Sequence, residues 1–255
     1  MQILLADAKT MRADVPALPG GLSLSEPAFG KVARELAGEM GSFSIEELRG
    51  MLGGSRKVNE ETSGRYRDFP VTEPRAALLA YTGQAYRHLR AEDFGSEELL
   101  FAQKKLFITS FLYGLLRPLD GIKPYRMEEF VRLEVTGDVP MNRFWRPLLT
   151  DFLLSRAKGD GGTLLQLSTE EFEKLFEWKR VTEEVRVVKP YFYVRTGGAL
   201  KVQAVWAKSC RGAMLREIIK GGLDSPEELK AFSYEGFRYA PDHGDEDHLY
   251  FIREG

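Results

Sequence analysis

The sequence predicts a mixed α/β fold of the α+β class, a single domain over residues 1–255 in which helices flank a mixed sheet. Short apolar segments typical of buried strands occur at residues 2–6, 107–113 and 163–167. Amphipathic segments with helix-start signals lie between them. With 255 residues, of which 43% are hydrophobic and 29% charged, the chain has the size and composition of an ordinary globular protein with one core.

The net charge of the chain is −2, from 36 Lys and Arg against 38 Asp and Glu. A polyanion would therefore have to bind to a local patch, because the whole molecule provides no attracting field. No apolar run approaches the roughly 18 residues of a membrane span, and the first residues lack a basic leader with an apolar core. Cys210 is the single cysteine, in agreement with a reducing compartment. We expect a cytoplasmic monomer without a membrane anchor.

The first predicted strand, residues 2–6, ends in a polar cluster that contains Asp7, Lys9 and Thr10. Strands that end in this way often border a ligand site, although the same residues also suit a solvated turn. A loop follows, and then Ser25, as N-cap, and Pro27, in the first turn, predict a helix that runs to about Gly38.

A helical hairpin is predicted within about residues 26–64, as an insertion in the single domain. Ser44 and Glu47 form a capping box at the start of its second helix. A glycine-rich turn and the start of another helix follow, where Arg56 and Lys57 add positive charge. Free backbone N–H groups at such a turn bind phosphate, and the arrangement loosely resembles the helix-hairpin-helix motif that contacts DNA backbones. A purely structural helix pair is the alternative.

The segment 107–126, FITSFLYGLLRPLDGIKPYR, is the most distinctive stretch of the chain. Helices are predicted before it, at residues 74–89 and 96–106. Its first half reads as a buried strand, and prolines and glycines predict an exposed loop for its second half. This loop carries polar residues that either hold an anion or make structural pairs: Arg117, Asp120, Lys123, Tyr125 and Arg126.

In the C-terminal half, a helix at about residues 142–157 precedes the strand 163–167. Residues 168–171, which include Glu171, start the next helix, where ligands often bind. Two strands, 184–195 and 199–206, are predicted to form a hairpin that leads into a helix from about residue 207. Lys208 and Arg211 share one face of that helix's first turn, where cations oppose the helix dipole unless an anion is present.

No metal or cofactor site is predicted. The final strands, at residues 237–239 and 248–252, enclose an acidic segment, 242–248, whose composition suits a metal but whose spacing matches no pair of ligands on a helix. We interpret it as a solvated turn. Cys210 lies near Lys208 and Arg211, which would lower a thiol pKa, so a reactive cysteine is conceivable. A lone thiol more often serves packing.

Six motifs occur in an order that resembles the peroxide-stress protein YaaA family: DAKT at 7–10, LYGLLRPLDGIKPYR at 112–126, FW at 144–145, LSTEEF at 167–172, WAKSCRGAM at 206–214 and EGFRY at 235–239. The resemblance covers essentially the whole chain. It departs from the family pattern at Asp7, where Ala6-Asp7 stands in place of Ser-Pro, at Ser209, which stands in place of a lysine, and before Glu171, where the family usually has Asn. Asp7 and Ser209 are expected to remove positive charge from the site.

This resemblance implies a single mixed α/β fold with a positively charged cleft. It further implies protection against hydrogen peroxide by limiting free intracellular iron and oxidative DNA damage, and binding to DNA through a helix-hairpin-helix-like element. The positions that match the family motifs are Lys9, Thr10, Arg117, Tyr125, Arg126, Glu171, Lys208 and Arg211.

Two functions of different classes remain open. The first is binding of double-stranded DNA, with phosphates contacted by Lys9, Arg56, Lys57, Lys208 and Arg211. The second is an enzyme acting on a nucleobase or nucleotide in one pocket. In that enzyme Glu171 and Lys208 form the acid/base pair, and Tyr125 or Trp145 stacks on a base.

Overall fold

The computed structural model describes residues 1–12 and 14–255. A nine-stranded mixed sheet runs through the described chain, in the order β4-β3-β1-β6-β7-β11-β10-β9, with β8 paired to β7. Five central strands, β3, β1, β6, β7 and β11, are parallel, and the others pair antiparallel. The strands are β1 Gln2–Ala6, β3 Leu106–Ser110, β4 Gly114–Leu116, β6 Thr163–Gln166, β7 Arg186–Thr196, β8 Ala199–Lys201, β9 Ser233–Tyr234, β10 Phe237–Gly244 and β11 His248–Glu254.

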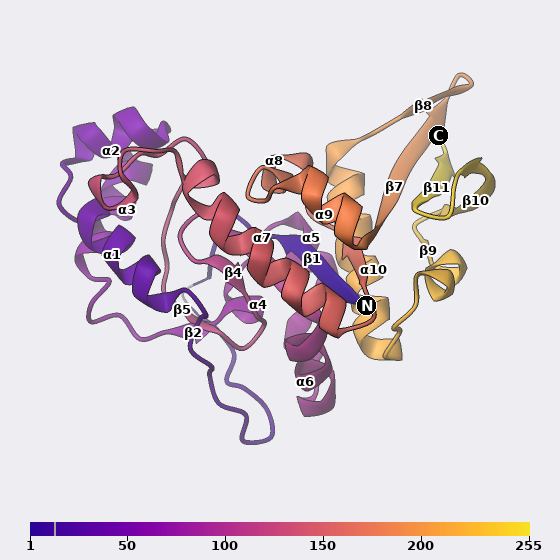
Figure 1. Cartoon of the computed structure of the whole chain (residues 1–255), viewed down its shortest axis with the longest axis horizontal. Helices are drawn as coiled ribbons and strands as arrows, with labels where there is room; N and C mark the ends of the chain where they lie inside the picture. The colour runs from indigo at the N-terminus through magenta and orange to yellow at the C-terminus, as the bar shows by residue number, and fades with distance from the viewer. Residues whose placement is uncertain (13) are drawn as a thin grey trace.

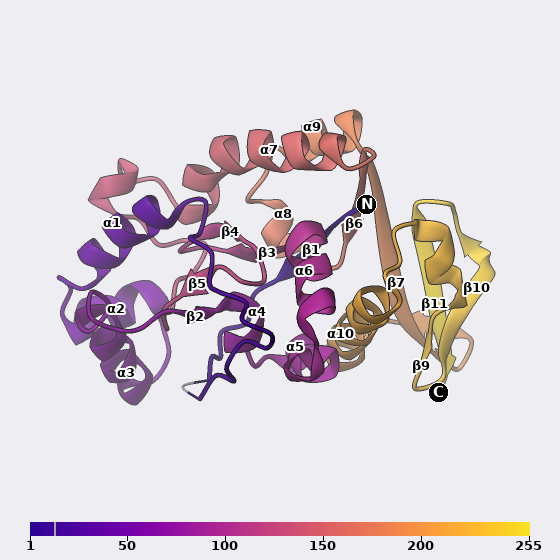
Figure 2. The same ribbon diagram turned by 90° about the horizontal axis from the view of Figure 1, so that it is seen from below.

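Helices cover both faces of the parallel strands (Figure 2). Helices α7, Met141–Gly159, and α9, Trp178–Glu184, lie on one face. Helices α5, Gln84–Leu89, α6, Ser96–Lys105, and α10, Ala204–Gly221, lie on the other. Both faces are therefore buried, which explains why β1 and β3 read as continuous apolar runs. The predicted mixed α/β fold is confirmed.

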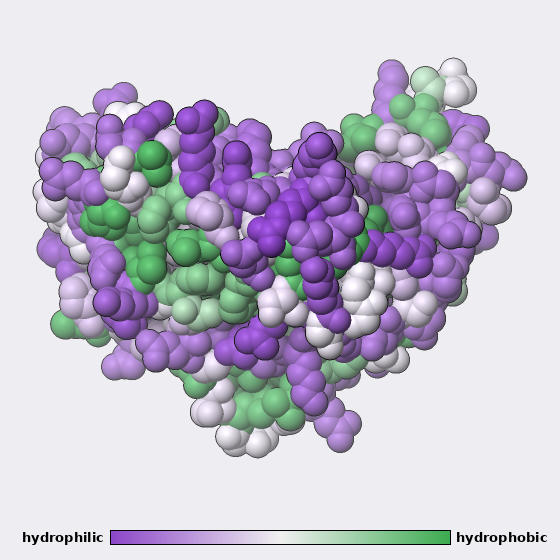
Figure 3. Space-filling view, viewed as in Figure 1, coloured by the Kyte–Doolittle hydropathy of each residue, from purple (hydrophilic) through white to green (hydrophobic). Residues whose placement is uncertain are grey.

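The helical hairpin lies at one end of the molecule and the β7–β8 hairpin at the other (Figure 1). Helices α1, Gly30–Met40, α2, Ile45–Leu52, and α3, Arg56–Arg67, form the helical end. The predicted capping box of Ser44 and Glu47 starts α2, and Ser55 caps α3. In the space-filling view the outline is notched between these two ends (Figure 3).

Short elements complete the described chain: β2 Arg75–Ala76, α4 Ala77–Ala80, β5 Gly121–Ile122, α8 Glu170–Glu173 and the 3₁₀ helices Ala91–Asp93, Glu134–Thr136 and Pro226–Ala231. Strands β2 and β5 pair antiparallel as a small second sheet. Within residues 1–12 and 14–255, no helix is both long and apolar enough for a bilayer crossing.

Two helices predicted in the N-terminal half have wrong bounds, because distant partners bind the residues concerned. Helix α1 begins at Gly30 and not at Ser25, whose hydroxyl donates to Asp120 Oδ1 at 2.6 Å. The helix predicted at 74–89 is interrupted between α4 and α5. There the backbone N–H of Thr82 donates to the carbonyl oxygen of Thr10 at 3.0 Å, which ties this turn to the end of β1.

The second half of the segment 107–126 is not the exposed loop that the sequence predicts. Asp120 is 0% exposed and Tyr125 is 5% exposed. Asp120 accepts hydrogen bonds from the hydroxyl of Ser25 and from the backbone N–H of Arg117, which keep the buried carboxylate satisfied. The segment therefore passes through the interior and presents only some of its polar atoms to a cavity.

Candidate functional site

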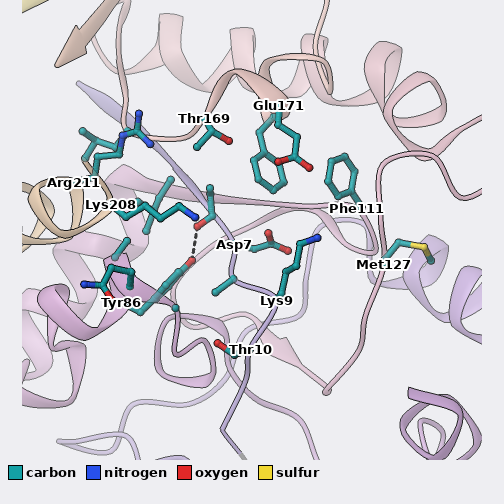
Figure 4. Close-up of a pocket in the computed structure, with 18 of the residues that line it drawn as sticks. Asp7, Lys9, Thr10, Tyr86, Phe111, Met127, Thr169, Glu171, Lys208 and Arg211 are labelled. Atoms are coloured by element: carbon teal, nitrogen blue, oxygen red, sulfur yellow. Dashed lines mark hydrogen bonds between the residues drawn. The ribbon is translucent and has the colours of Figure 1, made fainter. Parts of the chain in front are cut away.

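A cavity of about 360 Å³ opens beyond the carboxyl ends of β1, β3 and β6 (Figure 4). Its walls include residues 7–10 after β1, Phe111 after β3, and Leu167 and Thr169 after β6. Strand β1 lies between β3 and β6, so the strand order reverses direction beside it. In open sheets with parallel strands, ligands bind in the crevice at such a reversal. The fold therefore places this cavity where a ligand site is expected.

Seven of the predicted site residues line this one cavity: Lys9, Thr10, Tyr125, Arg126, Glu171, Lys208 and Arg211. The other three lie outside it. Arg117 pairs with Asp120 at 3.4 Å. Arg56 and Lys57 are exposed on α3, and the Nε of Arg56 is 2.9 Å from Glu60.

Asp7 lies in the middle of the cavity, between Lys208 and Arg211 on one side and Phe111 and Met127 on the other (Figure 4). The hydroxyl of Tyr125 donates to Asp7 Oδ2 at 2.8 Å, and it also contacts the hydroxyls of Tyr81 at 2.8 Å and Ser110 at 2.7 Å. Burial raises the pKa of Asp7 to about 7, and the negative charge of Glu171 adds to the effect, against the opposing hydrogen bond from Tyr125. A carboxyl group of this pKa can give or take a proton near neutral pH.

The position of Asp7 directly after β1 placed it in a polar cluster at a predicted ligand site, but Asp7 was not predicted to be an acid. The carboxyl of Asp7 also accepts a hydrogen bond from Tyr125, which is 118 residues away in the chain.

Glu128, which the sequence analysis also missed, holds two of the predicted cations. Lys9 Nζ lies 2.7 Å from one of its carboxylate oxygens, and Arg126 Nη2 lies 3.2 Å from the other. Arg126 further donates to the carbonyl oxygens of Leu52 at 2.7 Å and Gly53 at 3.2 Å. The side chain of Arg126 therefore joins the rim of the cavity to the turn between α2 and α3.

Lys208 and Arg211 carry positive charge into the cavity without an ion-pair partner among the described residues. Burial lowers the pKa of the Arg211 guanidinium, the charge of Glu170 opposes this without forming an ion pair, and the guanidinium stays charged. The Nε of Arg211 and the hydroxyl of Thr169 are both enclosed and have no hydrogen-bond partner in the described part of the chain. Such groups are usually satisfied, so this end of the cavity is suited to an anion.

Helix α10 begins at Ala204, not at residue 207 as predicted, so Lys208 and Arg211 lie beyond its first turn. The close approach of α10 to α5 depends on Gly212, because a Cβ there would lie 1.9 Å from the carbonyl oxygen of Ala85. This contact brings the cationic face of α10 to the cavity.

Three expectations about individual side chains are wrong. Ser209 is 1% exposed, donates to the carbonyl oxygen of Val205 and accepts from Gln84 of α5, so it does not change the charge of the cavity. Trp145 is fully buried and donates to the carbonyl oxygen of Phe111, so it cannot stack on a ligand. Burial raises the pKa of Cys210 to about 12, so the expected lowering by neighbouring cations is wrong, and the other interpretation, a thiol that serves packing, is confirmed by its full burial.

Two phenylalanine rings line the cavity. Phe111 and Phe172 stack with ring centroids 5.0 Å apart and an interplanar angle of 21°.

In the segment 242–248, His248 Nδ1 pairs with Asp245 at 2.8 Å. Across the described residues, no three His, Cys, Asp or Glu side chains gather as metal ligands would.

The sequence profile of the family described as peroxide stress protein YaaA matches residues 1–243 of the chain. A UPF0246 protein of Bacteroides fragilis (strain ATCC 25285) is 43% identical over 253 residues, which cover 98% of this chain and 98% of the relative. One from Porphyromonas gingivalis is 41% identical over 260 residues and one from Rickettsia felis is 32% identical over 255, each covering 100% of both chains.

Proposed function

Because the chain belongs to the peroxide stress protein YaaA family, we propose that it serves the peroxide stress response as an enzyme that binds a nucleotide in the cavity beside β1. The ligand carries an anionic group, held by Lys208 and Arg211, and a planar ring. The proposal keeps the cytoplasmic location and monomeric state that the sequence predicts, and the link to intracellular iron stays a prediction.

The observation that carries this proposal is the unpaired charge of Lys208 and Arg211 across a partly open cavity from Asp7 and Glu171. The Lys9 and Arg126 cations are already held by Glu128, so the positive charge available to a ligand anion is that of Lys208 and Arg211. An anion clamp beside an acid and a base is not required for binding a DNA backbone, whereas an active site uses both.

Size and shape agree with a nucleotide. A volume of about 360 Å³ lies within the range of small-molecule sites. The stacked rings of Phe111 and Phe172 offer an aromatic wall on which a base can stack. A duplex would have to bind over the rim, because it cannot enter a cavity of this size.

Calorimetric titration with AMP, GMP, CMP and UMP tests the proposal. We expect at least one to bind, and Lys208→Ala and Arg211→Ala each to weaken binding tenfold or more, since each removes a charge-assisted contact. Lys31→Ala, on exposed α1, is the matched control and should bind as the wild type does. Binding by none of the four nucleotides, or equal binding by all the variants, would contradict the proposal.

Binding of double-stranded DNA is the second candidate function. Its specific support is that α2, the Gly53–Gly54 turn and the capped start of α3 form a helical hairpin on which Lys57 is exposed and has no acidic partner among the described residues. Two contacts weaken it: Arg56 pairs with Glu60, and Arg126 contacts the carbonyl side of the turn.

Fluorescence anisotropy with a labelled duplex at several salt concentrations tests this candidate. Binding through the hairpin predicts that Lys57→Ala reduces the salt dependence by about one unit of slope. The cavity variant Lys208→Ala should leave it unchanged in that case. An affinity that does not change with salt concentration, or that depends on Lys208 and not on Lys57, would contradict DNA binding through the helical hairpin.

A further inference from the structure

We propose that the cavity hydrolyses the N-glycosidic bond of a nucleoside 5′-monophosphate, with Asp7 as the general acid and Glu171 as the general base. This inference rests on the proposed function, because it needs the nucleotide to bind. It adds the bond that is broken and the role of each carboxyl group.

Asp7 and Glu171 are the two carboxyl groups of the cavity that make no ion pair in the described chain. Glu171 is near enough for its charge to act on Asp7, and its side chain points toward the same space (Figure 4). A pair of carboxyl groups that flank the bond, one protonated and one ionised, is the usual arrangement for glycoside hydrolysis. The surroundings of the two groups differ, because Asp7 is partly buried and Glu171 is exposed.

The difference arises from their surroundings. Asp7 is partly buried and held by Tyr125, and burial raises its pKa to about 7, so about half of it is protonated at neutral pH. Burial also raises the pKa of Tyr125 well above its usual value, so the phenol remains a donor. Glu171 stands on α8 without such an enclosure.

The arrangement of the walls orients the ligand. Lys208 and Arg211 lie at one end of the cavity, and Phe111 and Met127 lie at the other, with Asp7 between them (Figure 4). A phosphate held by the cations and a base placed against the rings would set the bond between sugar and base above Asp7. The ends of the cavity thus match the two ends of a nucleoside monophosphate.

The reaction balances as an addition of water. Asp7 gives its proton to the leaving base nitrogen as the C1′–N bond breaks. A water oxygen bonds to C1′, and its proton passes to Glu171. The products are the free base and ribose 5-phosphate, and transfer of the proton from Glu171 to solvent, with uptake of one by Asp7, restores the site.

The other described side chains of the cavity favour this reaction over acyl transfer. No His, Cys or Ser side chain is among the described lining residues. The Thr10 hydroxyl accepts from Thr82, and the Tyr86 hydroxyl donates to the carbonyl oxygen of Ala6, so neither is paired with a base as an activated nucleophile would be.

The test incubates the purified full chain with each of the four ribonucleoside and four deoxyribonucleoside 5′-monophosphates. Chromatography measures the free base, and a reducing-sugar assay measures the sugar phosphate. We expect equal release of both from at least one nucleotide. Asp7→Asn and Glu171→Gln should each reduce turnover about 100-fold or more while the Kd changes less than about threefold. Glu61→Gln, an exposed carboxylate on α3, is the control that should keep full activity.

The pH profile gives a readout that a structural role would not produce. Because Asp7 must be protonated, kcat/KM should fall as the pH rises above about 7. Nucleotides that bind but release no base would overturn this inference and leave the proposed function intact, whereas failure of all eight to bind would remove both. Unchanged turnover in both the Asp7→Asn and Glu171→Gln variants would also overturn it.

Discussion

Replacing Gly212 by alanine tests the contact that brings α10 to the cavity. A Cβ at this position would lie 1.9 Å from the carbonyl oxygen of Ala85, 2.7 Å from its carbonyl carbon and 3.0 Å from its Cα. These are backbone atoms, so no change of rotamer relieves the clash. Ordinary van der Waals contact begins at 3.4 Å, so α10 must move away from α5 by about 1.5 Å at this point.

Two effects of opposite sign decide the outcome. Alanine is favoured over glycine within a helix by about 1 kcal/mol. Overpacking of a well-packed contact costs about 1–3 kcal/mol, and a clash with backbone belongs at the upper end. We therefore expect Gly212→Ala to lower the free energy of unfolding by about 2 kcal/mol and the Tm by about 4–8 °C. Lys208 and Arg211 would move with the helix, so nucleotide affinity should fall about tenfold.

Gly38→Ala is the matched control, because Gly38 also lies within a helix but a Cβ there meets nothing within 4 Å. It should gain up to about 1 kcal/mol from helix propensity alone. Urea unfolding followed by circular dichroism measures both variants, and calorimetry measures the affinity. If Gly212→Ala stabilises the protein as Gly38→Ala does, the two helices are not in close contact and the reasoning fails.

Three further predictions address single side chains. Folded Asp7 keeps its proton up to pH about 7, whereas the unfolded group releases it near 3.8, so this group makes the wild type lose stability as the pH rises across that window. The difference in Tm between Asp7→Asn and the wild type should therefore favour the variant more at pH 8 than at pH 4. An equal difference at both pH values would contradict the assigned pKa. Native Cys210 should react with Ellman's reagent far more slowly at pH 8 than in urea, because the thiol is 0% exposed and burial raises its pKa to about 12; equal rates would contradict that burial. Trp145→Phe leaves the carbonyl oxygen of Phe111 without its donor and should lower the free energy of unfolding by about 1–3 kcal/mol in urea titrations, so unchanged stability would show that the bond contributes little.

Features with local causes were predictable from the sequence. The strand Gln2–Ala6 has the predicted bounds, because an apolar run and a polar stop define it. The start of α2 is also as predicted, since the Ser44 and Glu47 capping box needs only residues three apart. The hairpin turn at Gly53–Gly54 needs backbone angles that glycine adopts readily, with φ of 65° and 88°.

Features that depend on distant partners were not predictable. Ser25 looks like an N-cap, but its hydroxyl binds Asp120, 95 residues away. The helix predicted at 74–89 breaks where Thr82 binds the carbonyl oxygen of Thr10. In the site, the cations follow from residue type and position, whereas the acidity of Asp7 exists only after folding encloses it against Tyr125. The sign of a side chain's charge follows from its residue type, whereas a pKa shift depends on burial and neighbours that only the folded structure defines.

The family's connection with peroxide directs attention to thiol chemistry, because peroxide oxidises proteins mainly at accessible thiolates. In this chain Cys210 is the single cysteine, it is fully buried, and burial raises its pKa to about 12. Burial is the main cause of this rise, Glu235 adds to it, and the positive charges of Arg253 and Arg211 oppose it. Helix α10 thus holds a buried, protonated sulfur close to the cations that line the cavity, Lys208 and Arg211. Burial and the raised pKa of Cys210 therefore disfavour its oxidation by peroxide, whereas our proposed function assigns the role in peroxide stress to the cavity beside Asp7.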